Sequence, residues 1–346
     1  MALIYDIVAM QELQGFVQGV YEAQASVNFI GDQVFPNREN VNGEINWKLT
    51  KGQLADEDSA TFRAWDAEAS IGNRAGLSHI MGELAPMSRK YRVNEEESIR
   101  LRALTTGNTK PLVDAIYNDA AKGARAISVR IERARWECML TGKLVLAENG
   151  VFQTIDYGRN AAMSVTAAIP WTTVGSAVPV TNERAFIKAY RDLNGFDPAV
   201  VIMSADRIDN MLLNTEYRNL ATSTNGGTPS ILTIESLNII RRSFGLPTIV
   251  VFDGLVRVGG VSTRLLPADK LIFLPPAGRS VGVTLFAATA EAVELAEAKQ
   301  VSGDHAIGLT AVVDKTFDPV ATWTKVSAVA MPVMANPDYV MVADVA

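Results

Sequence analysis

The chain has 346 residues, of which 48% are apolar and 20% are charged, so it can bury a sizeable core and is not a disordered protein. Its formal net charge of −6 argues against a dedicated nucleic-acid binder, which normally carries a basic excess. The longest apolar runs, 271–276 and 281–288, are far shorter than the roughly 20 residues that a membrane-spanning helix requires.

The N-terminus lacks a basic region ahead of its apolar residues, which predicts a cytoplasmic protein without a signal peptide. Residues 1 to about 34 carry a modest helical pattern, and Phe35-Pro36-Asn37-Arg38 ends it. We therefore expect residues 1–42 to form an N-terminal arm.

Residues 43–93 are polar and strand-like, and a loop of this length usually serves a function, often by reaching a neighbouring molecule. It has an acidic tip, Asp56-Glu57-Asp58, and returns through the basic run Arg89-Lys90-Tyr91-Arg92. Acid on one limb and base on the other favours pairing between identical subunits. Trp47 and Trp65 lie in this segment, where little local core is expected, so we interpret them as anchors against a partner.

A long amphipathic helix is predicted over 111–143, with Pro111 in its first turn and Gly142 at its end. Its apolar positions recur at steps of three and four, which indicates one buried stripe that includes the lone cysteine: Val113, Ile116, Ala120, Ala124, Ile127, Ile131, Ala134 and Cys138. We expect an inert, buried Cys138, since a single cysteine cannot form an internal disulfide. The opposite face is predicted to be charged and exposed: Asp114, Asp119, Lys122, Arg125, Arg130, Glu132, Arg133, Arg135 and Glu137. By itself, the stripe is equally compatible with a coiled coil.

After this helix, Glu148-Asn149-Gly150 predicts a β-hairpin between 143–146 and 151–157. Short helices and strands then alternate, which is typical of a compact α/β region at about 180–300. The expected elements are a helix from Asn182 to Leu193, a strand at 200–203, a helix from Ser204, an exposed loop at 223–230, a helix at 234–244 and strands at 248–253 and 270–274. The tail from 307 to 345 is strand-like. Core packing is favoured for Trp136 and Trp323.

The sequence offers little chemistry. Its two histidines, His79 and His305, lie far apart and it has one cysteine, so no metal site is predicted. The acidic tip lacks the glycine and the spaced oxygen ligands of a calcium loop. Thr141-Gly142-Lys143 ends a helix, whereas a phosphate-binding loop places its lysine at a helix start, and 256–260 is interpreted as a hairpin turn. We predict no catalytic residue and no cofactor.

The order of these segments resembles the major capsid proteins of tailed bacteriophages, with their Hong Kong 97-type shell fold. Several motifs look like the lambda-type family, also called major capsid protein E, and they span nearly the whole chain: Phe35-Pro36-Asn37-Arg38, Ile45-Asn46-Trp47, Arg133-Ala134-Arg135-Trp136-Glu137, Glu148-Asn149-Gly150, Phe317-Asp318-Pro319, Ala328-Val329-Ala330-Met331-Pro332 and Asn336-Pro337-Asp338.

The resemblance implies an α+β fold with five parts: an N-terminal arm (1–42), an extended loop (43–93), a peripheral domain (94–180) with the spine helix 111–143, an axial domain (181–300) and C-terminal strands returning to the peripheral domain (301–346). It also implies that the chain assembles with itself into hexamers and pentamers around DNA, which it contacts non-specifically. A decoration protein, a scaffold and a portal are the further partners it suggests. We do not carry over the covalent cross-linking known in part of this fold class.

The resulting hypothesis is a non-enzymatic major capsid protein that forms the icosahedral shell of a virion and assembles in the host cytoplasm. The alternatives are an encapsulin-like compartment shell and a soluble α/β enzyme. The candidate subunit-interface residues are Phe35, Arg38, Trp47, Asp56, Glu57, Asp58, Trp65, Arg89, Arg92, Arg125, Arg130 and Arg133, of which the last three are possible partners for the acidic tip of a neighbour.

Overall fold

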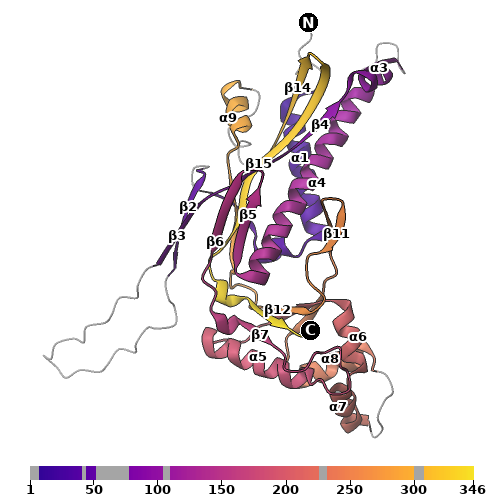
Figure 1. Cartoon of the computed structure of the whole chain (residues 1–346), viewed down its shortest axis with the longest axis vertical. Coiled ribbons are helices and arrows are strands. Elements are labelled where there is room, and N and C mark those ends of the chain that lie inside the picture. Colours follow the sequence, from indigo (N-terminus) through magenta and orange to yellow (C-terminus); the bar gives the residue numbers. More distant parts are fainter. Residues whose placement is uncertain (1–7, 41–43, 52–77, 104–109, 226–231, 300–307) are drawn as a thin grey trace, which may run out of the picture. The chain divides into compact units, whose positions relative to one another are not determined.

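A computed structural model describes residues 8–40, 44–51, 78–103, 110–225, 232–299 and 308–346 (Figure 1). The chain divides into two compact units. Unit 1 comprises Met1–Trp47, Gly82–Ile155 and Gly282–Met334, and unit 2 comprises Lys48–Met81, Asp156–Val281 and Ala335–Ala346. Within the described ranges, no helix is long and apolar enough to cross a membrane.

Unit 1 is built on a five-stranded sheet whose central strand is β15. Its strands are β1 (Asn37–Glu39), β4 (Pro86–Val93), β13 (Gly282–Ala287), β14 (Leu309–Phe317) and β15 (Val320–Met334). β14 runs antiparallel along one side of β15, while β4 and β13 pair with successive halves of its other side. β1 adds to the far edge of β13 as a parallel strand.

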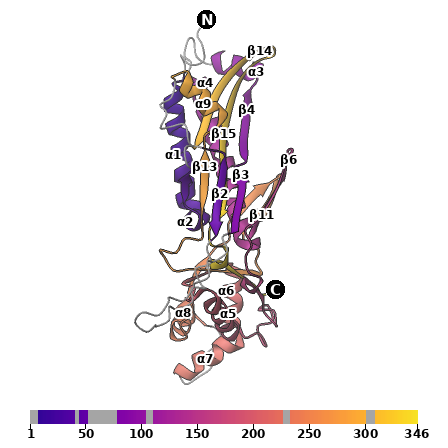
Figure 2. The same cartoon turned by 90° about the vertical axis from the view of Figure 1, so that its left-hand side faces the viewer.

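The helices of unit 1 are α1 (Met10–Asn28), α2 (Gly31–Val34), α3 (Glu95–Ala103), α4 (Lys110–Thr141) and α9 (Ala290–Glu297). α4 packs on the sheet, and α1 packs against both α4 and β14 (Figure 2). The predicted stripe is confirmed as the core of this unit, where Ile116, Ala120 and Ala124 are fully buried. Gly123 permits the close approach of helix and sheet, because a β-carbon there would lie 2.6 Å from a methyl carbon of Val326.

Two further pairs of strands are described. β5 (Lys143–Glu148) and β6 (Val151–Asp156) are joined by Asn149 and Gly150, both with positive φ, which confirms the predicted turn. β2 (Asn46–Lys51) pairs with β3 (Ser78–Glu83).

Unit 2 has a sheet in the order β7-β16-β12-β8-β9. These strands are β7 (Ser164–Thr166), β8 (Val200–Met203), β9 (Thr248–Val251), β12 (Lys270–Leu274) and β16 (Met341–Asp344). The helices are α5 (Pro179–Asn194), α6 (Ala205–Leu213), α7 (Thr215–Asn225) and α8 (Ile234–Ser243), and the 3-10 turns are Ala161–Met163 and Pro337–Tyr339. Its own core includes the fully buried Tyr190, Met211 and Phe273. The predicted turn at 256–260 is confirmed between β10 (Leu255–Val258) and β11 (Val261–Arg264).

Three predictions about the course of the chain differ from the structure. The helix expected to start at the cap Asn182 begins at Pro179, and the amide of Asn182 bonds the carbonyl of Val178 within the helix. The return limb of the extended loop is partly a sheet strand, since β4 pairs with β15 from Pro86 to Val93. The C-terminal tail divides, because β14 and β15 belong to unit 1 whereas β16 pairs with β12 and β7 of unit 2. The domain boundaries stay a prediction.

Candidate subunit interface and arm attachment

The C-terminal half of α4 is buried on two sides and not only along the predicted stripe. Glu132 and Arg135 were predicted on the exposed, charged face, but their exposed fractions are 0% and 1%. That prediction is wrong because α2 packs on this part of the helix and covers the side turned away from the stripe.

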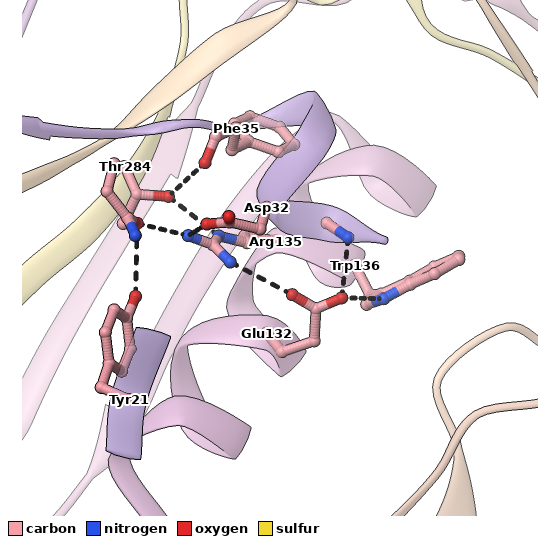
Figure 3. A network of polar contacts seen from close by, with 9 residues as sticks. Tyr21, Asp32, Phe35, Glu132, Arg135, Trp136 and Thr284 are labelled. Carbon is pink, nitrogen blue, oxygen red and sulfur yellow. Dashed lines mark hydrogen bonds and ion pairs between the residues drawn. The ribbon is translucent and has the colours of Figure 1, made fainter. Parts of the chain in front are cut away.

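Glu132 fastens α2 to α4 (Figure 3). Its Oε1 accepts hydrogen bonds from the backbone amide of Gly31 at 2.9 Å and from the Trp136 indole at 2.8 Å. Glycine at position 31 leaves room for this contact, since a β-carbon there would lie 2.6 Å from Oε2 of Glu132 and displace the carboxylate. Burial raises the pKa of the Glu132 carboxyl above its usual value of 4.5, and the charge of Arg135 opposes that rise.

Arg135 joins the arm, the helix and the sheet. Its Nε donates to the Thr284 hydroxyl on β13 at 2.9 Å, and its Nη1 donates to Glu132 at 3.3 Å. Nη2 donates to Asp32 on α2 at 3.0 Å and to Asn37 on β1 at 2.6 Å. We call this set of contacts, centred on Glu132 and Arg135, the arm network.

Two further contacts extend the arm network along the arm. Tyr21 on α1 donates its hydroxyl to Asn37 at 3.2 Å, and burial raises the pKa of this phenol. The Thr284 hydroxyl donates to the carbonyl of Phe35 at 3.1 Å. Each of these groups thus meets a partner within the same chain, and together the contacts attach the arm to α4 and the sheet.

A second buried pair lies in unit 2. Arg241 on α8 donates to both carboxylate oxygens of Glu183 on α5, at 2.5 and 2.8 Å. It also donates to the Tyr217 hydroxyl on α7 at 3.1 Å and to the carbonyl of Pro247 at 2.9 Å. This helix network connects three helices, and burial raises the pKa of Tyr217.

Two interface candidates are buried inside their own chain. The side chain of Phe35 is 0% exposed, and that of Trp47 is 5% exposed. The indole of Trp47 packs over Gly82 of β3, where a β-carbon would lie 3.0 Å from the ring. Both residues therefore pack inside their own chain, and their role at a subunit interface stays a prediction.

Arg130 and Arg133 have a partner in their own chain. Glu148, at the end of β5, lies 3.3 Å from Nε of Arg130 and 3.6 Å from Nη1 of Arg133. These ion pairs tie the β5–β6 hairpin to the spine helix. A neighbour's acidic tip would have to compete with Glu148 for them.

Other candidates remain on the surface. Arg38 is exposed on β1, Arg125 is exposed on α4, and Arg89 and Arg92 are exposed on β4. Asp56, Glu57, Asp58 and Trp65 lie outside the described residues.

Core packing was predicted for Trp323, but its side chain is half-buried and its ring faces two cations. The amine of Lys90 stands 4.0 Å and the guanidinium of Arg92 5.5 Å from the centre of its ring. We call Arg89, Lys90, Arg92 and Trp323 the basic strand. The ring holds Lys90 and Arg92 in place, and all three cations of the basic strand are exposed.

The sequence did carry one signal for the arm network. Ser128, Glu132, Trp136 and Met139 follow one another at steps of four and three, and all are buried. A tryptophan and a methionine on the charged face mark a second buried stripe. Within the described ranges, no group of three or more His, Cys, Asp or Glu side chains is arranged to hold a metal ion.

The model of a protein family described as phage major capsid protein E matches residues 20–345. The chain belongs to this family. The phage capsid protein has no match in a sequence search of curated proteins. It is a structural shell protein of the virion capsid, and capsid proteins of this kind associate into multimeric shells.

Solved structures show the same fold. A crystal structure of a protein assigned as the capsid protein of a prophage in E. coli CFT073 is 12% identical, with a TM-score of 0.64, and the match covers 98% of this capsid protein and 99% of that chain. A phage-related protein from Bordetella bronchiseptica RB50 is 14% identical, with a TM-score of 0.57 and 96% coverage of both chains. The α+β fold is thus the Hong Kong 97-type capsid fold.

Proposed function

We propose that the chain forms the icosahedral shell of a tailed phage from hexameric and pentameric capsomers, without catalysing a reaction. The near complete match to the family of major capsid proteins carries this proposal. It also favours a DNA-enclosing shell over an encapsulin-like compartment and over a soluble enzyme. Packaged DNA, a scaffold, a portal and a decoration protein are the partners that such a shell would meet in the host cytoplasm.

We further propose that the acidic tip Asp56-Glu57-Asp58 of one subunit pairs with the basic strand of a neighbour. The charges are complementary, and Arg89, Lys90 and Arg92 are exposed on β4. Each contact between exposed charges is weak, but a closed shell repeats it many times, so the contacts act together. Arg125 on α4 is a second candidate partner for the tip.

Electron microscopy of the expressed chain tests this function. Wild type is expected to form closed shells, and a uniformly monomeric protein would contradict the proposed function. Reversing the tip (Asp56→Lys, Glu57→Lys and Asp58→Lys together) should reduce shell formation and leave the circular dichroism of the subunit unchanged. Reversing Glu95, Glu96 and Glu97, which are exposed on α3, is the matched control for net charge.

A charge-exchange experiment tests whether the tip pairs with the basic strand in particular. Arg89→Glu with Arg92→Glu should also reduce shell formation, and combining this variant with the reversed tip should restore it. If the combined variant assembles no better than either parent, the tip does not pair with the basic strand.

A further inference from the structure

Arg207 lies in the first turn of α6 in unit 2, next to core residues of the same helix. α6 contacts α7 and α8, and Ile208 and Met211 belong to the hydrophobic core of the unit. The exposed fraction of Arg207 is 8%. A side chain so placed has lost nearly all of its hydration.

The guanidinium of Arg207 has no partner in the described chain. Its Nε and Nη1 are enclosed and take no hydrogen-bond acceptor, and no carboxylate of the described chain lies within ion-pair distance. The nearby acids are engaged elsewhere, because Asp206 and Asp253 each lie 3.1 Å from Arg264. Asp253 also accepts the first amide of α6, from Ala205, at 3.0 Å.

Two other buried guanidinium groups have the acceptors that Arg207 lacks. Arg135 and Arg241 are 1% and 2% exposed, and each donates to a buried glutamate and to further acceptors. A buried charge without such partners costs several kcal/mol, by order of magnitude. Nη2 is the only nitrogen of Arg207 that is not enclosed, so an acceptor from outside the chain can reach the group along that side.

We propose that Arg207 receives a carboxylate of a neighbouring copy of this chain in the assembled capsomer, an inference that rests on the proposed self-assembly. A guanidinium forms strong, charge-assisted hydrogen bonds to a carboxylate, which Nη2 can donate here, and arginine suits ion pairs buried at interfaces. The chain has 38 acidic and 32 basic residues, so carboxylates are the charges that a second copy has in surplus. Unit 2 itself exposes Asp209 and Glu235, which form no ion pair in the described structure.

The test uses Arg207→Met, which keeps the length of the side chain and removes its charge. Below the assembly concentration, its urea midpoint of unfolding should rise above that of wild type, because an unpartnered buried charge is gone. The concentration at which shells form should increase at least about tenfold, because the neighbour's carboxylate is left unpaired. A purely structural arginine would shift stability and assembly in the same direction.

Two matched variants calibrate the result. Arg242→Met removes an exposed charge from α8 and should leave both measurements near wild type. Arg241→Met breaks a paired buried arginine and should lower the urea midpoint. Arg207→Met would overturn the proposal if its midpoint fell, or if it formed shells at the wild-type concentration.

An anion from solution is tested separately. If sodium phosphate or sodium acetate raised the midpoint of wild type but not of Arg207→Met, relative to sodium chloride at equal ionic strength, Arg207 would be a site for small anions and the neighbour's carboxylate would be excluded. If wild type formed no shells, the proposed function would fail and this inference with it. Normal wild-type shells together with unaffected Arg207→Met shells would overturn this inference alone.

Discussion

The two buried glutamates differ in how many donors they have. In the arm network of unit 1, Glu132 accepts hydrogen bonds from an amide and an indole as well as from Arg135. In the helix network of unit 2, the Glu183 carboxylate accepts hydrogen bonds from Arg241 alone within the described chain. Arg135 in turn reaches α2, β1 and β13, while Arg241 holds α5, α7 and the turn after α8. One network attaches a distant segment, and the other fixes the packing of neighbouring helices. The difference predicts how each unit responds to losing its arginine.

The largest effect is expected for Arg241→Met. It leaves Glu183 buried, at 0% exposure, without a hydrogen-bond donor, and breaking a buried pair in this way costs about 3–5 kcal/mol of unfolding free energy. Urea unfolding should show the loss, and hydrogen exchange should locate it in α5 and α8. Equal protection of these helices in wild type and variant would contradict the importance of the pair.

Arg135→Met is expected to cost less, about 2–3 kcal/mol, because Gly31 and Trp136 still donate to Glu132. Its effect should be local, with faster hydrogen exchange in α2 and β1 and earlier proteolytic cleavage near residue 35. Exposed Arg125→Met on the same helix is the control. If the arm stayed as protected as in wild type, Arg135 would not be what attaches it.

The smallest effect is a pH dependence. The pKa of Glu132 is raised in the folded chain, so its contribution to stability is fully present below its usual value of 4.5 and is lost as the pH rises through the folded pKa. The urea midpoint of wild type should therefore fall relative to Glu132→Gln as the pH rises from about 4 to about 8. Glu95→Gln, on the exposed start of α3, controls for the loss of one surface carboxylate. A constant difference between wild type and Glu132→Gln would refute the role of this carboxyl.

Local signals made the sequence informative about single elements. The spacing of apolar residues at steps of three and four predicted the end of α4 to within two residues, and Asn149-Gly150 predicted the hairpin turn. Both signals depend only on neighbours along the chain. The short apolar strands at 200–203 and 270–274 were also predicted correctly. The order of such elements was enough to indicate the capsid family.

Long-range contacts explain what the sequence did not reveal. Glu132 and Arg135 were assigned to the surface because they are charged, and contacts between about one hundred and one hundred and fifty positions away in the chain help to bury them. The pairing of β4 with β15 joins residues 86–93 to 322–329, so no local pattern could place that strand in the sheet. The interface candidates depend on a second copy, which is why Arg38, Arg89, Arg92 and Arg125 stay predictions.

The interleaving of the two units has a consequence for synthesis on the ribosome. The central strand β15, at Val320–Met334, is needed by β4, β13 and β14, and β16, at Met341–Asp344, is the strand between β12 and β7. Neither sheet can close until these last segments have emerged. A nascent or truncated chain therefore lacks both finished units, and we expect it to be degraded before it can enter a growing shell.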